Sequence, residues 1–308
     1  MSDHILVLGA GGFVGHHLVR ALSQRGEKII AVSRQTVEFG MSNVESIIGE
    51  PCERAQFAPL VARSHSVVHL ASRSTPGGSA GNALAELQDN LRPTLALLEA
   101  LQHKPQTNLL YVSSGGSLYG STSNEMATEA AAVEPRSYHG AGKIAAEHFI
   151  SAWCSQYGSA ATLVRPSNIY GPGQIERAGF GIIPTGFGKI IRGETLTVWG
   201  DGSSVRDYIY IDDFVALCTA TLTTPMPTGA LVLNAASGVG IKLNDLLIAM
   251  EMVAGQKLRR SYDHSRVVDA TRVVMDATLA NRRYGWLPKT PLHEGLRQTW
   301  RWLNTTRH

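Results

Sequence analysis

The stretch RSYHGAGK, residues 136–143, holds three side chains that can exchange protons: Tyr138, His139 and Lys143. Residues four apart on an α-helix lie on one face, whereas residues five apart lie about 140° apart around the helix axis. If the stretch is helical, Lys143 therefore shares a face with His139, and Tyr138 points elsewhere. An imidazole titrates near pH 6.5, and a neighbouring ammonium group favours its neutral form. The pair predicts a general acid–base site.

A glycine-rich segment, GAGGFVG, follows an apolar run at residues 4–8 and precedes an amphipathic helical pattern. Glycines at 9, 12 and 15 let the backbone turn tightly, approach a pyrophosphate closely and pack the helix against the sheet. The first N–H groups of such a helix are free to bind phosphate oxygens. The segment therefore predicts a dinucleotide-binding site.

The next apolar run, KIIAV at residues 28–32, is followed directly by Ser33 and Arg34. Sheets that bind NAD usually keep a carboxylate at this place, where it accepts a hydrogen bond from the ribose 2′-hydroxyl. Ser33 does not repel a 2′-phosphate, and Arg34 can bind one. The alternative is a solvated loop arginine beside a permissive serine, so the pattern favours NADP over NAD only slightly.

Short apolar runs alternate with longer helical patterns through the first half of the chain. The runs typical of strands buried on both faces are residues 4–8, 28–32, 66–70, 108–112 and 160–164. Apolar residues recur at helical intervals in 13–25, 82–101 and 139–157. This alternation predicts an α/β fold with a parallel doubly wound sheet.

After Pro166 the pattern changes to glycine- and proline-rich loops with short strands, LTVW, DYIYI and LVLN. Shorter helices are expected near 212–223, 243–254 and 291–303. We expect residues 1–165 to form the dinucleotide-binding domain and residues 166–308 to form a smaller mixed α/β lobe, partly interleaved with it. The lobe should cover the carboxyl edge of the sheet, where open α/β sheets bind ligands.

The composition excludes several classes of protein. No segment approaches the ~20 uninterrupted apolar residues of a membrane span, and the N-terminal sequence has no cationic start or cleavage site, so we expect a cytoplasmic protein. The net charge of +3 is spread without basic runs, which argues against nucleic-acid or membrane binding. Cys52, Cys154 and Cys218 lie in no metal-binding spacing and are expected to be buried thiols.

Several stretches in combination resemble the extended short-chain dehydrogenase/reductases, specifically the NAD(P)-dependent nucleotide-sugar epimerase/dehydratase family, and most closely its UDP-glucose 4-epimerase-like branch. The stretches are GAGGFVG, VVHLAS, NLRPTLALLEAL, YVSSGGSLYG, HGAGK, VRPSNIYGPGQ, VWGDGSSVRDYIYIDD and YGWLPKTPLHEGLRQTW. The resemblance covers nearly the whole chain and implies a Rossmann-type fold with a bound nicotinamide cofactor. It places the cofactor against Gly9, Gly12, Phe13, Val14, Gly15, Ser33, Arg34, Leu70, Ala71, Lys143 and Pro166.

The same resemblance implies the catalytic roles. In the family, a tyrosine exchanges the proton of the sugar hydroxyl, a lysine four residues on lowers its pKa, and a serine or threonine shares the hydrogen bond. Here His139 occupies the tyrosine position and Gly115 the hydroxyl position, so Ser114 or Ser117 would have to supply the hydroxyl. Three interpretations stay open: His139 is the acid–base group, Tyr138 swings into the site, or the fold has another chemistry or none.

Four residues are expected to bind the nucleotide sugar. By resemblance, Asn168 and Arg206 meet the diphosphate, Arg266 contacts phosphate, and Asp269 contacts the uridine ribose. A guanidinium group suits phosphate because it donates two parallel hydrogen bonds. Gly181 stands where many epimerases have an asparagine, so only its backbone could bind there.

The reaction follows from a missing acid. By resemblance, dehydratases and decarboxylating relatives carry carboxylates just ahead of the Tyr-Gly pair that is Tyr119 and Gly120 here, but this chain reads GGSLYG. We therefore expect 4-epimerisation of a UDP-sugar through a transient 4-keto intermediate. The alternatives are an NADPH-dependent reductase of a nucleotide-linked 4-keto sugar, and a catalytically silent protein that binds cofactor and nucleotide sugar.

The helices expected near 82–101 and 139–157 show apolar stripes wider than one sheet face needs. The stripe of the second helix comprises Ala141, Ile144, Ala145, His148, Phe149 and Trp153. In the resembled family such helices pair across a two-fold axis into a four-helix bundle, so we expect a homodimer.

Overall fold

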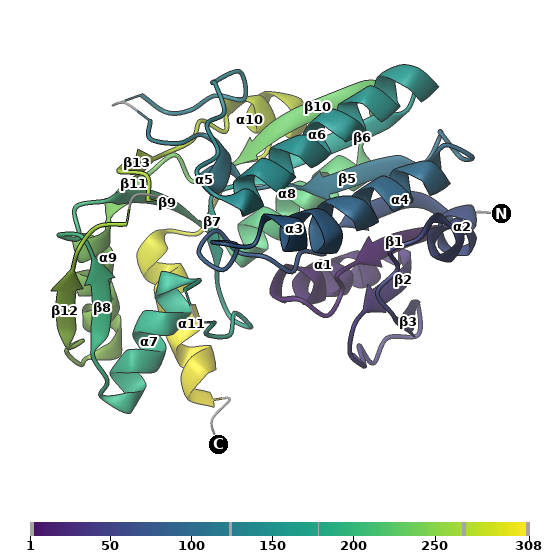
Figure 1. Ribbon diagram of the computed structural model, residues 1–308. Helices are drawn as coiled ribbons and strands as arrows, with labels where there is room; N and C mark the ends of the chain where they lie inside the picture. Colours follow the sequence, from purple (N-terminus) through teal and green to yellow (C-terminus); the bar gives the residue numbers. More distant parts are fainter. Residues whose placement is uncertain (1–2, 123–124, 178, 267–268, 306–308) are drawn as a thin grey trace.

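A seven-stranded, entirely parallel sheet forms the centre of the molecule (Figure 1). The computed structural model describes residues 3–122, 125–177, 179–266 and 269–305. In spatial order the strands are β10 (Gly229–Ala235), β6 (Ala160–Pro166), β5 (Asn108–Val112), β4 (Ser64–His69), β1 (His4–Leu8), β2 (Lys28–Ser33) and β3 (Val44–Ile48). The direction of winding reverses between β1 and β4, which confirms the predicted doubly wound fold and puts the ligand crevice at the carboxyl ends of these two strands.

Helices cover both faces of this sheet because the strands are aliphatic on both faces. One face packs against α1 (Phe13–Gln24) and α8 (Ile211–Thr223), and its buried residues include Val7, Leu18 and Phe214. The other face packs against α2 (Arg54–Ala62), α4 (Arg92–Leu101) and α6 (Tyr138–Tyr157). Trp153, expected on the outer stripe of α6, is buried in this second core.

The smaller lobe lies beside the carboxyl edge of the sheet, at the left of Figure 1. It contains a four-stranded sheet of β7 (Asn168–Tyr170), β9 (Val205–Tyr210), β11 (Gly240–Lys242) and β13 (Arg272–Val273), and a parallel pair of β8 (Leu196–Trp199) and β12 (Arg260–Asp263). Its helices are α7 (Ile182–Arg192), α9 (Leu243–Ala254) and α11 (Leu292–Thr305), whereas α10 (Thr278–Tyr284) packs against β10 and α8 beside the main sheet (Figure 1).

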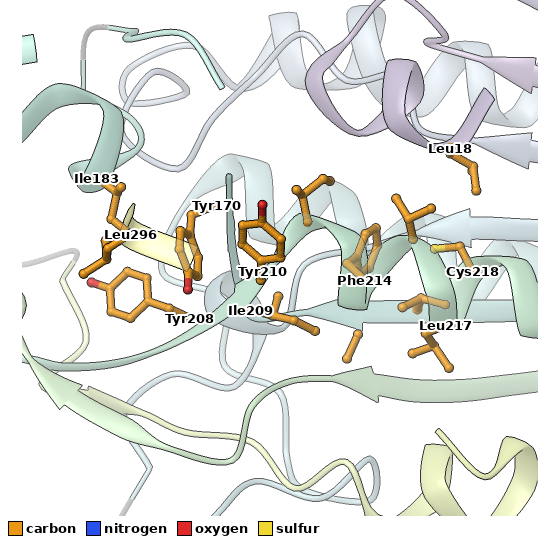
Figure 2. Close-up of a cluster of buried hydrophobic side chains, with 14 of the residues drawn as sticks. Leu18, Tyr170, Ile183, Tyr208, Ile209, Tyr210, Phe214, Leu217, Cys218 and Leu296 are labelled. Atoms are coloured by element: carbon orange, nitrogen blue, oxygen red, sulfur yellow. The ribbon is translucent and has the colours of Figure 1, made fainter. Parts of the chain in front are cut away.

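The lobe and the sheet share one hydrophobic core. Figure 2 shows Tyr170, Tyr208 and Tyr210 beside Leu296 of α11, and the same cluster continues along α8 towards Leu18. The rings of Tyr170 and Tyr210 meet edge to face, with centroids 5.7 Å apart. Such continuous packing holds the lobe rigidly over the edge of the sheet.

Three features differ from the sequence-based expectation. The helix near 212–223 was expected in the smaller lobe, but it is α8, which packs beside α1 on the main sheet. The strand LVLN was expected in the smaller lobe, but it belongs to β10, which pairs in parallel with β6 at the edge of the main sheet. The stretch 82–101, expected as one continuous helical pattern, is divided into α3 (Ala83–Glu86), a π-helical turn η1 (Leu87–Leu91) and α4. Pro93 lies in the first turn of α4, where its missing N–H and its ring disfavour an unbroken α-helix.

Candidate functional site

A cleft of about 1360 Å³ opens between the carboxyl edge of the main sheet and the smaller lobe. Residues from both halves of the chain line it. They include all the predicted cofactor-binding and substrate-binding residues, together with Ser114, Ser117, His139 and Lys143. Tyr138, with 46% of its surface exposed, is not among the lining residues. The structure therefore assembles one site from segments far apart in the sequence.

The glycine loop can hold a phosphate because its backbone is tightly folded. Gly9 has a φ of +87°, and a Cβ there would lie 2.8 Å from the backbone nitrogen of Ala71. At Gly15 a Cβ would lie 2.2 Å from the carbonyl oxygen of Gly9, so only glycine lets α1 approach the loop this closely. Helix α1 begins at Phe13 after Gly12, and its first three residues line the cleft, where the N–H groups of a first helical turn have no partner within the helix. These residues fit a dinucleotide pyrophosphate.

At the end of β2, Ser33 and Arg34 both line the cleft. The Ser33 hydroxyl donates to the carbonyl oxygen of Gln35 at 2.6 Å, and the Arg34 side chain is exposed. A serine thus stands where a ribose-binding carboxylate would end this strand, as the sequence indicates.

The start of α6 places His139 and Lys143 together. Ser137 caps this helix, because its hydroxyl accepts a hydrogen bond from the backbone N–H of Gly140 at 3.1 Å. With this start, His139 and Lys143 are buried on one face. The Lys143 ammonium donates to the carbonyl oxygen of Val112 at 2.9 Å and lies 4.8 Å from the centroid of the Tyr111 ring.

Burial changes the titration of both groups. Desolvation, reinforced by the charge of Lys143, lowers the pKa of His139 to about 3. Desolvation also lowers the pKa of Lys143 to about 8, against the opposing effect of Glu86 and Glu147. At neutral pH the imidazole of His139 is therefore neutral and the ammonium of Lys143 is charged. This pair of groups can exchange a proton with a sugar oxygen and stabilise negative charge on it.

Sequence reasoning missed two polar residues near His139: Ser74, which contacts the ring, and Asn90, which contacts Ser74. The Ser74 hydroxyl oxygen lies 2.7 Å from Nδ1 of His139. The Asn90 side-chain amide donates to the same oxygen at 3.1 Å. Ser74 follows β4 in a loop and Asn90 lies in η1, so neither belongs to a recognisable pattern around residue 139.

The position expected to carry a hydroxyl, Gly115, has no room for a side chain. A Cβ on Gly115 would lie 2.2 Å from Sδ of Met275, which comes from the C-terminal half of the chain. The neighbouring hydroxyls of Ser114 and Ser117 are hydrogen-bonded to each other at 3.0 Å. A side chain at residue 115 would therefore require the Met275 side chain to move.

The opposite wall of the cleft carries the predicted nucleotide-sugar residues. Arg266 is ion-paired with Asp269 at 2.8 Å and lies over the Trp199 ring at 5.6 Å from its centroid. The Arg206 guanidinium donates to the carbonyl oxygen of Val205 at 2.9 Å, and burial lowers its pKa. Among the described residues, these contacts use only some of the five N–H groups of each guanidinium, and both side chains line the cleft.

Asn168 and Gly181 line the same wall. The side-chain amide nitrogen of Asn168 donates to the carbonyl oxygen of Asp207 at 2.8 Å, so the side-chain oxygen of Asn168 takes no part in this hydrogen bond. Gly181, with a φ of +79°, precedes α7, and the buried Gln174 beside it has a side-chain oxygen without a hydrogen-bond partner in the described structure. Gln174 is a polar group of this wall that sequence reasoning missed.

Other kinds of site are not found in the described part of the chain. Its histidine, cysteine and acidic residues form no group of three or more that could hold a metal ion. The three cysteines are free thiols, of which Cys154 and Cys218 are buried as expected, whereas Cys52 is partly exposed. None of the described helices is both long and apolar enough to cross a membrane.

Comparison with known proteins agrees with this geometry. The chain is 27% identical to UDP-glucose 4-epimerase of Mycolicibacterium smegmatis, over 96% of each protein. It is also 27% identical to dTDP-glucose 4,6-dehydratase of Streptomyces griseus, over 100% of this chain and 96% of that protein.

Solved structures give the same result. UDP-glucose 4-epimerase of Thermotoga maritima, solved with UDP-glucose, superposes with a TM-score of 0.92 at 28% identity, over 99% of this chain and 100% of that one. The Thermus thermophilus UDP-glucose 4-epimerase complex with NAD superposes with a TM-score of 0.90 at 26% identity, over 98% and 99% of the two chains. The sequence model of the NAD dependent epimerase/dehydratase family matches residues 5–234, and this chain belongs to that family.

Proposed function

We propose that this protein epimerises a UDP-sugar at C4 through a transient 4-keto intermediate. The observation that carries the proposal is that one cleft holds a glycine loop, the buried His139–Lys143 pair and two arginines on the opposite wall. A nicotinamide cofactor bound to the glycine loop supplies reversible hydride transfer. Relatives with UDP-glucose or NAD in their structures support this assignment of ligands.

The residues of the cleft divide the work. Arg206 and Arg266 bind the diphosphate and so fix the sugar next to α6. His139 exchanges the proton of the sugar oxygen, and Lys143 supplies the positive charge that stabilises developing negative charge there. In the segment GGSLYG no carboxylate is available to act as the acid of an elimination, which favours epimerisation over dehydration.

A direct experiment tests this proposal. The purified protein is denatured, and released nicotinamide and nucleotide sugar are identified by mass spectrometry. The intact protein is also incubated with UDP-glucose, UDP-galactose and their N-acetyl and uronic acid counterparts, and products are resolved by NMR. Interconversion of one C4 pair supports the proposal. Tight binding of both ligands without turnover would instead select a silent binding protein.

A second candidate, an NADPH-dependent reductase of a nucleotide-linked 4-keto sugar, is favoured by Ser33 and Arg34. No carboxylate ends β2, and the exposed Arg34 borders the cleft. In Arg34→Asp, NADP binding should weaken far more than NAD binding, because the carboxylate repels a 2′-phosphate and accepts from a 2′-hydroxyl. Equal losses for both cofactors would reject an NADP site. Release of oxidised cofactor after each turnover would distinguish the reductase from the epimerase.

A further inference from the structure

The loop between β4 and α3 holds His139 at two points. The backbone N–H of His139 donates to the Ser79 hydroxyl oxygen at 3.2 Å, and the ring nitrogen Nδ1 lies 2.7 Å from the Ser74 hydroxyl oxygen. His139 lines the cleft, and among the described residues none is hydrogen-bonded to its other ring nitrogen, Nε2. The ring is thus held from its Nδ1 side, and Nε2 is left for a ligand.

The direction of the hydrogen bonds to this ring follows from Asn90. The backbone N–H of Arg73 can only donate, and it donates to Oδ1 of Asn90 at 2.8 Å. This bond fixes the orientation of the Asn90 amide, whose Nδ2 then donates to the Ser74 hydroxyl oxygen at 3.1 Å. Because Ser74 accepts from Asn90, its own proton is available for the acceptor at 2.7 Å, which is Nδ1 of His139.

We infer that Ser74 fixes His139 in the tautomer that carries its proton on Nε2, so that the resting site is ready to protonate the carbonyl oxygen of a keto sugar and not to take a proton from the corresponding hydroxyl. A ketone oxygen only accepts hydrogen bonds, and Nε2–H only donates one. A sugar hydroxyl that is to be oxidised must instead give its proton to Nε2, but in this tautomer Nε2 already carries a proton. The inference rests on the proposed function and specifies the oxidation state of the sugar that the resting site fits.

The surroundings of the ring support a single neutral tautomer. Burial and the charge of Lys143 hold the pKa of His139 near 3, so the ring does not carry protons on both nitrogens at neutral pH. The hydroxyl beside the ring comes from Ser74, at 2.7 Å from Nδ1, and Gly115 carries no hydroxyl.

The proton balance of the reduction closes through Ser74. As C4 of the keto sugar gains a hydride from reduced nicotinamide, the Nε2 proton bonds to O4. Nδ1 takes the Ser74 proton, and the partly exposed Ser74 takes one proton from solvent. One hydride and one solvent proton are consumed for each alcohol formed, and His139 is left in the opposite tautomer, with its proton on Nδ1. The starting tautomer is restored once the product has left, when Nε2 takes one proton from solvent and Nδ1 releases one to solvent through Ser74.

The tautomer can be measured without turnover. In the full chain labelled with ¹⁵N-histidine, long-range ¹H–¹⁵N correlation spectra distinguish protonated from unprotonated ring nitrogens, and His139 is identified as the signal lost in His139→Phe. We expect protonated Nε2 and unprotonated Nδ1 in the wild type and in Ser74→Thr, and loss of this preference in Ser74→Ala. Protonated Nδ1 in the wild type, or an unchanged pattern in Ser74→Ala, would overturn the inference.

The consequence for the sugar is measured by single-turnover reduction of a UDP-4-keto-6-deoxyhexose by protein loaded with reduced nicotinamide. In Ser74→Ala the rate of keto-sugar reduction should fall about tenfold or more, and the rate of UDP-sugar oxidation should fall less. Ser74→Thr should restore the rate of reduction. Ser155 is an exposed serine on α6, the helix that carries His139, and Ser155→Ala is the matched control, which should behave like the wild type. Equal effects of Ser74→Ala on both directions would contradict the preference for the ketone. If the wild type turns over no nucleotide sugar, the proposed function fails, and the NMR pattern still decides the tautomer.

Discussion

His139 is the side chain on which the proposed proton exchange depends. His139→Phe should abolish hydride transfer, with a loss of about 10²- to 10⁴-fold, and should retain cofactor, because phenylalanine fills the buried site without a group that exchanges protons. His139→Tyr should keep or improve activity by supplying the phenol of the family. Tyr138→Phe should change little, because Tyr138 does not line the cleft.

These variants are compared by the absorbance of reduced nicotinamide when UDP-sugar is added. Oxidation by His139→Phe at the wild-type rate, together with its loss in Tyr138→Phe, would show that Tyr138 is the catalytic group. If neither the wild type nor any of the three variants oxidises the sugar, the protein has the fold of the family without its catalytic activity.

The pH dependence of sugar oxidation follows from His139 and Lys143. The pKa of His139 is lowered to about 3, so the ring is neutral above that pH and gains a second proton only as the pH falls through it. The pKa of Lys143 is lowered to about 8, so its positive charge is present below that pH and is lost as the pH rises through it. The rate should therefore be level from about pH 5 to 7 and fall above about pH 8.

A stopped-flow series at constant ionic strength tests this profile. In Lys143→Arg the charge persists at every accessible pH, so the alkaline fall should disappear even if the rate is lower. An inflection near pH 6.5 in the wild type would mean that His139 titrates like a solvated histidine.

Arg206 and Arg266 provide a test of the diphosphate site. Replacing either with alanine should weaken UDP-sugar binding by about 1.5–3 kcal/mol, because a charge-assisted hydrogen bond to phosphate is lost. Calorimetric titration with UDP measures this loss, and cofactor affinity should be unchanged. Arg25→Ala, an exposed arginine outside the cleft, is the control. Unchanged UDP affinity in both cleft variants would place the nucleotide elsewhere.

At the scale of elements, the short helix α5 (Gly115–Leu118) depends on a contact with a distant segment. Gly115→Thr should lower the free energy of unfolding by about 1–3 kcal/mol, because its Cβ would overlap Met275. Gly116→Thr in the same helix is the matched control, since a Cβ there meets nothing within 4 Å. Urea unfolding measures both variants.

A double-mutant cycle isolates the contact. Met275→Ala is destabilising by itself because it leaves a cavity, but the additional cost of Gly115→Thr should largely disappear in that background. Equal costs of Gly115→Thr in the two backgrounds would mean that Met275 is not the obstacle.

The elements that the sequence predicted well are those whose residues are buried in a regular pattern. β1, β2, β5 and β6 are aliphatic and buried, and their expected ranges agree with the structure within two residues. β3 was missed because its pattern is mostly exposed, as suits an edge strand. β10 was recognised as a strand but assigned to the wrong sheet, because strand pairing over more than 60 residues leaves no local signal.

The same distinction holds for the candidate site. The glycine loop and the His139–Lys143 face follow from local spacing, and the structure brings them to one cleft. Ser74 could not be predicted, because it meets His139 across 65 residues of sequence through a loop without periodicity. The Met275 contact with Gly115 is likewise a matter of tertiary packing.

For the molecule as a whole, the surface of α3, η1 and α6 predicts self-association. Leu84 is 68% exposed and Phe149 49% exposed, and Leu87 and Tyr157 are also exposed on these elements. α6 packs beside α3 and η1, so the three elements that carry these exposed side chains are neighbours. We expect a homodimer through this face.

Light scattering at micromolar concentration tests the expected dimer. Phe149→Asp should produce a monomer, because an unpaired carboxylate in an apolar interface is costly to bury. Met252→Asp is the control, since Met252 is 73% exposed on α9 of the smaller lobe. A monomeric wild-type protein would remove the idea.

The pairing of β10 with β6 has a consequence for how the chain matures on the ribosome. During synthesis β6 emerges long before residues 229–235, which later cover its edge. Until then the nascent sheet exposes a hydrophobic, unpaired edge strand, which promotes aggregation. We expect a translation product truncated at residue 165 to require chaperone protection, whereas one extended through β10 completes the edge and escapes it.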